Sequence, residues 1–246
     1  MDTQEYEIMY QVEQQHWWYQ GMEDITRAVL NRCYAPGAGL RILDAGCGTG
    51  AAMTTYLAEY GDVTGFDLSE VALNFCKIRN ARRLVCASVG NIPFPSDSFD
   101  LITSFDVLYE RAVPEDAASL AELARVLVRG GRVLLRLPAY DWLRGSHDEV
   151  IHTARRYTAG RAAHILQESG LTVERVSYAN TFLFPIALAK RFYDRIWMPG
   201  ERKSDLSLGV GPFNQFLRSI LTLEAPLVSR MGLPFGLSVI AVGKKP

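Results

Sequence analysis

The sequence predicts an α/β fold built on a parallel, doubly wound sheet. Over most of the chain, short apolar runs alternate with segments in which apolar residues recur at helical spacing. This alternation is typical of successive βαβ units. The first strong apolar run, residues 41–45, ends at the glycine-rich turn Gly46–Gly50. A strand, a tight glycine loop and the start of a helix, in that order, form a ligand-binding site at the edge of such a sheet.

Seven strands are expected, at residues 41–45, 63–66, 84–87, 99–104, 132–137, 171–178 and 236–242. Helices are expected between them at 22–33, 51–60, 69–80, 114–128 and 158–170, with Ser69 and Thr158 as N-cap residues. Two more helical patterns, at 186–197 and 213–230, lie between the last two strands. We therefore expect an N-terminal helical cap over 1–35, a core over 36–181, a helical insertion or lid over 182–235 and a final core strand over 236–246.

The composition is that of an ordinary globular protein and argues against several classes of protein. Hydrophobic residues make up 48% and charged residues 22% of the 246, and the net charge is −1, so no overall basic field attracts nucleic acid. The four cysteines form no CxxC pair, which argues against structural zinc and a disulfide scaffold. The sequence shows no signal-peptide core and no apolar run of membrane-spanning length. We therefore expect a cytoplasmic protein without a transmembrane segment.

Two kinds of ligand fit the glycine loop, and the acid before it helps to choose between them. Gly46, Gly48 and Ala51 satisfy a loose dinucleotide fingerprint, which alone is weak. Asp44 precedes the loop, where a carboxylate would repel a pyrophosphate and suit an ammonium group. S-adenosylmethionine (SAM) carries an ammonium, a sulfonium and a ribose but no phosphate, so the loop favours SAM.

Three segments, in order, resemble the motifs of class I SAM-dependent methyltransferases of the methyltransferase type 11 family. Leu43–Gly50 resembles the first motif, Asn91–Ile102 a later one, and Gly130–Leu135 the fifth strand with its preceding turn. The resemblance covers about 40 to 137 and implies a seven-stranded sheet of order 3-2-1-4-5-7-6 with an antiparallel last strand. It also implies SAM as methyl donor, S-adenosylhomocysteine as product, and an O, N or C nucleophile as acceptor.

The same resemblance assigns the cofactor site. Asp67 lies 21 residues after Gly46, at the end of the second expected strand, where a carboxylate can accept both ribose hydroxyls; the alternative is a helix-capping acid. Ser88 stands where the family often has an acid that contacts adenine. The cofactor-binding candidates are Asp44, Ala45, Gly46, Cys47, Gly48, Asp67, Leu68, Ser88, Val89, Phe105 and Tyr19.

The acceptor side departs from the family pattern. The family commonly reads Glu-His after the fourth strand, where this chain has Tyr109-Glu110, so a base is expected elsewhere. The polar loop 138–157 supplies His147 and His152, and we take these two with Tyr109 as catalytic candidates. Arg155, Arg156 and Tyr157 are candidates for holding an anionic acceptor, and Asp148, four residues before His152, would share its helix face. The alternative is a solvated loop with ion pairs, and no metal site is expected.

Aromatic residues recur at both ends of the chain. Trp17 and Trp18 are candidates for covering the acceptor, and Tyr19 for a cation–π contact with the sulfonium; the alternative is packing of an N-terminal helix on the core. The segment 182–235 is apolar and locally basic. It fits a lid over an apolar acceptor or a peripheral membrane contact, against the plainer alternatives of core or homodimer surface.

The sequence thus predicts a SAM-dependent methyltransferase acting on a small molecule, such as a natural product, a sugar or a lipid-linked metabolite. Two alternatives stay open. One is a methyltransferase that acts on a peptide, protein or RNA, and near-zero net charge weighs against RNA. The other is a SAM-binding protein without transfer activity, against which the intact glycine loop and Asp67 weigh.

Overall fold

The computed structural model describes residues 3–113, 115–145, 148–149, 151–197, 211 and 213–246. Its centre is a seven-stranded sheet of order β3-β2-β1-β4-β5-β7-β6. The strands are β1 Leu40–Ala45, β2 Gly61–Asp67, β3 Leu84–Cys86, β4 Phe99–Phe105, β5 Leu127–Pro138, β6 Thr172–Ala179 and β7 Ser238–Lys244. Neighbours among the first five pair in parallel, whereas β7 runs antiparallel to both β5 and β6. The expected strand order and the antiparallel last strand are confirmed.

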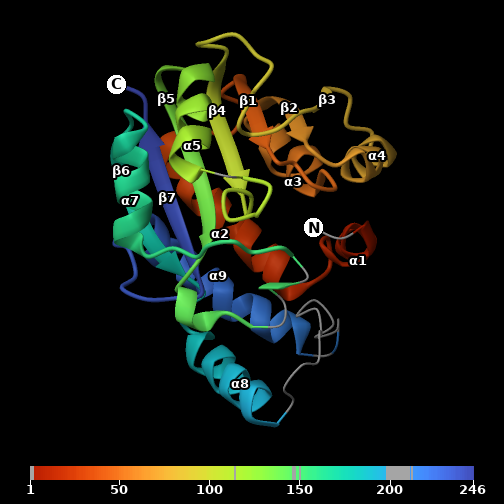
Figure 1. Ribbon diagram of the computed structural model, residues 1–246, viewed down its shortest axis with the longest axis vertical. Coiled ribbons are helices and arrows are strands. Elements are labelled where there is room, and N and C mark those ends of the chain that lie inside the picture. The colour runs from red at the N-terminus through yellow and green to blue at the C-terminus, as the bar shows by residue number, and fades with distance from the viewer. Residues whose placement is uncertain (1–2, 114, 146–147, 150, 198–210, 212) are drawn as a thin grey trace.

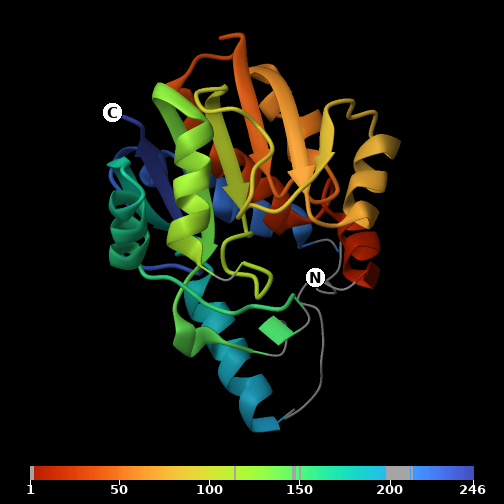
Figure 2. The ribbon, with the colours of Figure 1, turned by 45° about the horizontal axis from the view of Figure 1, so that its top comes forward.

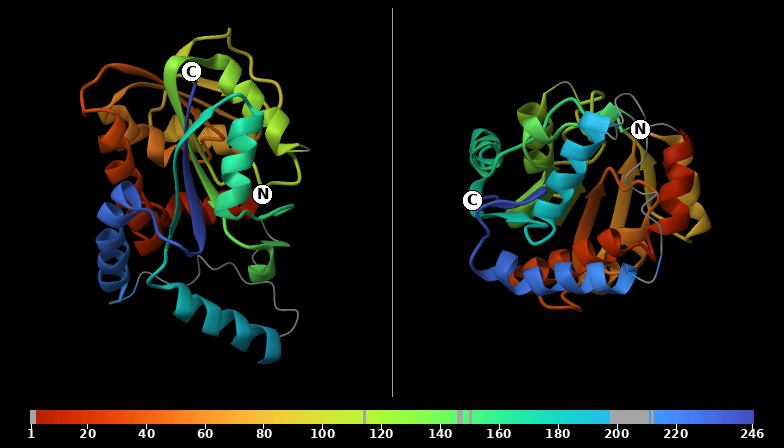
Figure 3. Two further views of the ribbon diagram at one scale, coloured as in Figure 1. Left: turned by 90° about the vertical axis from the view of Figure 1, so that its left-hand side faces the viewer. Right: turned by 90° about the horizontal axis from the view of Figure 1, so that it is seen from below.

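Helices cover both faces of the sheet (Figure 1). Along the chain they are α1 Thr3–Val12, α2 Trp17–Cys33, α3 Ala51–Thr54, η1 Leu57–Glu59, α4 Glu70–Ile78, α5 Asp116–Val126, η2 Asp141–Leu143, α7 Ala159–Glu168, α8 Phe184–Trp197 and α9 Asn214–Arg230. α2 and α9 lie side by side on one face (Figure 3), and α5 and α7 lie on the other. Figure 2 shows α1 beside α4, where Tyr10 stacks on Phe75 with ring centroids 4.7 Å apart.

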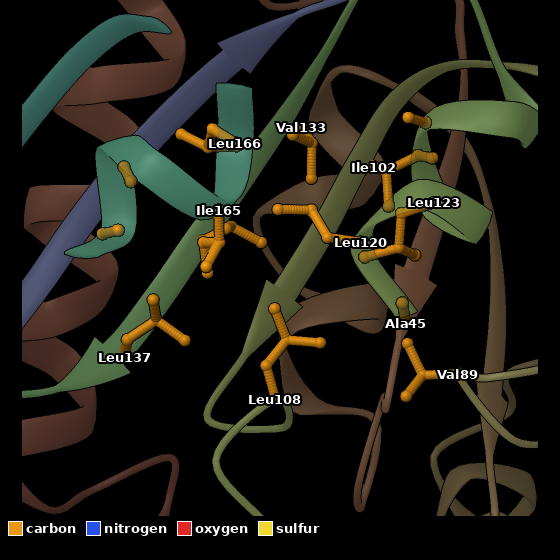
Figure 4. Packing of buried hydrophobic residues seen from close by; sticks show 14 of the residues in the cluster. Ala45, Val89, Ile102, Leu108, Leu120, Leu123, Val133, Leu137, Ile165 and Leu166 are labelled. Atoms are coloured by element: carbon orange, nitrogen blue, oxygen red, sulfur yellow. The ribbon is translucent and has the colours of Figure 1, made fainter. Parts of the chain in front are cut away.

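The core follows from the two-residue period of the strands. Ile102 on β4 and Val133 on β5 face α5 and α7 and pack against Leu120 and Ile165 (Figure 4). Their neighbours Leu101 and Leu134 face the opposite layer with residues of α2 and α9. Because successive side chains of a strand point to opposite faces, each central strand contributes apolar side chains to two cores.

Two expected helices have different bounds in the structure. The helix expected over 51–60 is the short α3 followed by η1, and the hydroxyls of Thr54 and Thr55 donate to the carbonyls of Gly50 and Ala51. Such side-chain bonds compete with a continuing helix. Conversely, the helix expected over 22–33 begins earlier, at Trp17, and runs through Gly21. A Cβ on Gly21 would lie 2.6 Å from Leu221 of α9, so glycine permits the close approach of the two helices.

The described residues of the segment 182–235 form two helices, α8 and α9, close to the two expected patterns. α8 lies beyond the carboxyl ends of the parallel strands, away from the sheet (Figures 1 and 3). Residues 198–210, which separate the two helices, fall outside the described residues. Within the described part of the chain, no helix is both long enough and apolar enough to cross a bilayer.

Candidate active site

A cavity of about 960 Å³ lies at the carboxyl ends of β1, β2 and β4. This volume is at the upper end of the range of about 300–1,000 Å³ found for small-molecule sites. The glycine loop, the ends of β1 and β2 and Ser88-Val89 form one end, which we call the cofactor end. Residues of α2, α8 and α9, together with Tyr109 and Glu110, form the other, the acceptor end.

The glycine loop has a fixed backbone that opens onto the cavity. The amides of Gly46 and Cys47 both donate to the carbonyl of Phe66, at 2.8 and 2.9 Å. Gly46 and Gly48 have φ of 78° and 53°, the left-handed region that favours glycine. A Cβ on Gly46 would also lie 2.3 Å from a methyl of Val107. The loop therefore requires glycine both for its conformation and for its packing.

Two buried carboxylates flank the loop. Asp67, at the end of β2, accepts hydrogen bonds from the amides of Gly48 and Ser69, each at 2.9 Å. Asp44, at 2% exposure, accepts from Thr103 Oγ1 at 2.7 Å. Burial raises the pKa of both acids, that of Asp44 to about 6. A ligand cation would favour the ionised form of Asp44, whereas a pyrophosphate would meet two acids, so the site suits SAM better than a dinucleotide.

The other predicted cofactor residues gather at the same place. Every one of the candidates lines the cavity except Ala45, which is buried in the core beneath the loop. Ser88 Oγ accepts from the amide of Gly90 at 3.2 Å, and Leu68 is largely exposed. Their individual roles stay predictions.

The aromatic cluster at the start of α2 lines the cavity through Trp17, Trp18 and Tyr19. The guanidinium of Arg136 lies 4.9 Å from the ring centroid of Trp18 and 5.0 Å from that of Phe105. Nε of Arg136 donates to Asp106 at 2.6 Å. One face of each of these two rings therefore already meets a cation of the protein.

The loop after β5 places its polar residues differently from our expectation. Asp148 pairs with Arg156 through two bonds, of 2.8 and 3.0 Å, and both side chains are buried. His152 instead lies in a turn with φ 54°. Our prediction that Asp148 and His152 share a helix face is therefore wrong. The left-handed conformation of His152 ends the helical turn, and Arg156 pairs with the carboxylate of Asp148 instead. His147 falls outside the described residues.

Of this loop's predicted side chains, Arg156 lines the cavity. Tyr157 is fully buried, and its hydroxyl lies 3.0 Å from Asp116 and 3.2 Å from the carbonyl of Leu108. Arg155 donates to the carbonyl of Val113 at 2.6 Å. Arg155, Tyr157 and His152 are not among the described residues that line the cavity. Their expected substrate and catalytic roles stay predictions.

Tyr109 and Glu110 line the acceptor end. Burial raises the pKa of Tyr109 well above its ordinary value, so this phenol is a proton donor rather than a base at neutral pH. Burial also raises the pKa of Glu110, and the nearby His152 opposes that effect. Backbone bonds join the two segments, since the amide of Arg111 donates to the carbonyl of His152 at 3.0 Å.

Comparison with known proteins agrees with this geometry. Residues 43–135 match the family model described as a methyltransferase domain. The chain is 38% identical to a demethylmenaquinone methyltransferase of Clavibacter sepedonicus over 120 residues, which are 47% of this chain and 48% of that protein. A relative of the same name from Staphylococcus aureus is 37% identical over 103 residues, 39% of this chain and 42% of its own. The chain thus spans about half the length of these relatives.

Solved structures share the whole architecture. The methyltransferase in complex with the Trm112 activator of Haloferax volcanii has a TM-score of 0.63 at 18% identity and covers 99% of this chain and 94% of its own. The geranyl diphosphate C-methyltransferase of Streptomyces coelicolor has a TM-score of 0.59 at 13% identity. The match covers 90% of this chain and 79% of that enzyme. These identities show the fold alone. Residues 43–135 of the chain are therefore a methyltransferase domain, and the sheet around them has the class I fold. A methyltransferase domain with a glycine loop between two buried acids supports SAM as the cofactor.

Several polar residues that our site prediction left out also line the cavity, among them Glu110, Arg136 and Asn180. A charge in the apolar run Val133–Leu137 marked Arg136 as unusual. The side-chain oxygen of Asn180 and the indole nitrogen of Trp17 are buried without a hydrogen-bond partner among the described residues. Buried polar groups are nearly always paired, so both atoms are available to a ligand. The described residues contain no group of three or more His, Cys, Asp or Glu placed to hold a metal ion.

Proposed function

We propose that this methyltransferase transfers the methyl group of SAM to an amphiphilic, lipid-linked small molecule. The observation that carries the proposal is the acceptor end of the cavity, where Leu183, Ile186, Ala187, Phe213 and Leu217 form an apolar wall. The unpartnered polar atoms of Trp17 and Asn180 supply anchors for a polar head beside that wall. A site with apolar walls and a few polar groups is what an amphiphile requires.

The names of the relatives support the same substrate class. Demethylmenaquinone carries a quinone head and an isoprenoid tail, and the apolar wall at the acceptor end would suit such a tail. A concave site of about 960 Å³ with mainly apolar walls also favours a small acceptor over a protein or an RNA. The expected cytoplasmic location and the homodimer alternative stay predictions.

The chain's own groups would orient the reactants for an in-line transfer, in which the sulfur–methyl bond breaks as the acceptor–methyl bond forms. SAM supplies the activated methyl group and a neutral sulfide leaving group. Asp44 would hold the ammonium and Asp67 the ribose, which fixes the direction of the methyl group. Trp17 and Tyr19 would exclude water from the reacting centre. Alignment of this kind contributes much of the rate of such a reaction.

A base is needed only when the acceptor carries a proton at neutral pH. Glu110 lines the acceptor end, and its raised pKa suits proton acceptance better than that of an exposed glutamate. We therefore add Glu110 to His147 and His152 as a proposed base. Tyr109 would serve as a hydrogen-bond donor to the acceptor instead. Of the two helices in the segment 182–235, α8 is the proposed lid. α9 is not, because it packs with α2 in the core layer on one face of the sheet.

Transfer of radiolabel from methyl-labelled SAM tests this function. The enzyme is incubated with a lipid extract, with demethylmenaquinol, or with an aqueous metabolite extract, and label is counted in the organic phase, the aqueous phase and the acid precipitate. We expect label in the organic phase, and much less of it with the cofactor-site variant Asp67→Ala at a SAM concentration that just saturates the wild type. Label that appears only in aqueous products would refute the lipid-linked acceptor. Label in the precipitate would indicate a protein or RNA acceptor.

A further inference from the structure

Exposed large hydrophobic residues gather at one part of this protein. Eleven such side chains are exposed among the described residues, and nine of them lie in η2 or in the segment 182–235. Single exposed apolar side chains are normal, but their concentration marks an interaction surface. The nine are Trp142, Phe182, Ile186, Tyr193, Phe213, Phe216, Leu223, Met231 and Phe235.

α8 carries its share of these residues along one side. Phe182, in the turn just before α8, and Ile186, Ala189 and Tyr193 within α8 are exposed and follow one another at intervals of four, three and four residues. This spacing places them on one side of a helix. Lys190 is exposed beside them. We call Phe182, Ile186, Ala189, Lys190 and Tyr193 the α8 face. A helix that turned this side to water would normally carry polar residues there.

The charge of the segment differs from that of the rest of the chain. Residues 182–235 contain seven Lys and Arg against four Asp and Glu, a net charge of +3, whereas the whole chain has a net charge of −1. The remaining residues therefore carry −4. A basic, apolar helix in an otherwise acidic protein is complementary to a bilayer that contains anionic lipid.

The α8 face is continuous with the mouth of the cavity. Ile186, Lys190 and Phe213 line the cavity and are also exposed. α8 lies beyond the carboxyl ends of the strands, on the side of the molecule farthest from the amino ends of β4 and β5 (Figures 1 and 2). A surface that covered this face would thus lie directly over the opening to the acceptor end.

We propose that the α8 face, with Phe213 and Phe216 at the start of α9, docks this methyltransferase on an anionic bilayer surface. The apolar side chains enter the acyl boundary, and Lys190 lies at the level of the headgroups. The acceptor then passes between bilayer and cavity without crossing water. The functional role of this docking rests on the proposed lipid-linked acceptor. Membrane binding itself requires neither SAM nor acceptor.

Vesicle sedimentation without SAM tests the docking. Vesicles of phosphatidylcholine alone and with 30% phosphatidylglycerol serve as probes. We expect binding to the anionic vesicles that weakens with salt, and a loss of about tenfold in partitioning for Ile186→Ser. Ile78→Ser is the matched control, because Ile78 on α4 is 62% exposed and Ile186 is 65% exposed. Tyr193→Ser, outside the cavity wall, should weaken binding similarly, and Lys190→Gln about fivefold on anionic vesicles only.

The outcomes separate the docking from the proposed function. Equal partitioning of wild type, Ile186→Ser and Ile78→Ser, or no sedimentation at all, overturns the docking, whatever the enzyme methylates. A dimer in light scattering that Ile186→Ser and Tyr193→Ser dissociate, without vesicle binding, would assign the face to a second copy of this chain and also overturn it. Vesicle binding together with label only in aqueous products would leave the docking and refute the lipid-linked acceptor.

Discussion

Asp44 gives the sharpest test of the cofactor site, because the same burial that suits it to a ligand cation destabilises the protein without ligand. Burial raises the pKa of Asp44 from 3.8 to about 6. For an acid, this means that the folded state holds its proton more tightly than the unfolded state. Stability from this group is therefore fully present below about pH 4 and is lost as pH rises toward 6. One pKa unit is about 1.36 kcal/mol, so the loss at pH 7.5 is about 3 kcal/mol at most.

Asp44→Asn removes the ionisable group and keeps an oxygen that can accept from Thr103 Oγ1. Without ligand, the free energy of unfolding of the variant should exceed that of wild type by little at pH 4 and by up to about 3 kcal/mol at pH 7.5. At about 2–4 °C per kcal/mol, the Tm would rise by about 6–12 °C. Other titrating groups are common to both proteins, so their contributions cancel in this difference.

The assay is thermal or urea unfolding of both proteins at pH 4, 5, 6 and 7.5, with and without SAM. SAM should stabilise wild type much more than the variant at pH 7.5, because the variant lacks the carboxylate that meets the ammonium. A difference between the proteins that does not change with pH would refute the raised pKa. Equal stabilisation by SAM would refute the contact between Asp44 and the ligand cation.

Three further changes test the rest of the site. Asp67→Ala should weaken SAM binding by about 10–150-fold in isothermal titration, the range for a hydrogen bond to a charged group, and unchanged affinity would contradict the ribose assignment. Asp148→Asn leaves a buried arginine without its carboxylate and should cost about 3–5 kcal/mol in urea unfolding, against less than about 1 kcal/mol for the exposed ion-pair control Asp62→Asn. With a protonated acceptor, Glu110→Gln should lower turnover by about 10²–10⁴-fold if Glu110 is the base, whereas a loss of that size in His152→Ala alone would return the role to the histidine.

The cofactor end was predictable because its signals are local in the sequence. The strand, glycine loop and helix start of residues 40–54 are consecutive, and each has its own pattern. The bounds were less predictable where side chains act on the backbone, as Thr54 and Thr55 do at the end of α3. Gly21 shows the same limit, since its helical place depends on Leu221, two hundred residues away.

The pairings at the acceptor end were not predictable for a related reason. Asp148 had two suitable partners in the sequence, His152 and Arg156. The choice depends on a turn that places Arg156 against the carbonyl of Ala139, to which it donates at 2.9 Å. Nothing in the spacing of these residues encodes that turn, because it is fixed by contacts with β5.

The division between the two ends of the cavity also limits what the relatives imply about the acceptor. The family match covers residues 43–135, which contain the glycine loop, Asp67 and Ser88. Trp17, Arg136 and Asn180 line the acceptor end and lie outside that match, as do α8 and α9. Tyr109 and Glu110, at the same end, lie inside the match. The match therefore covers the cofactor end but only part of the acceptor end, so it does not by itself identify the acceptor. The identity of the acceptor must accordingly be read from those outer segments, where an apolar wall adjoins an exposed apolar and basic helix.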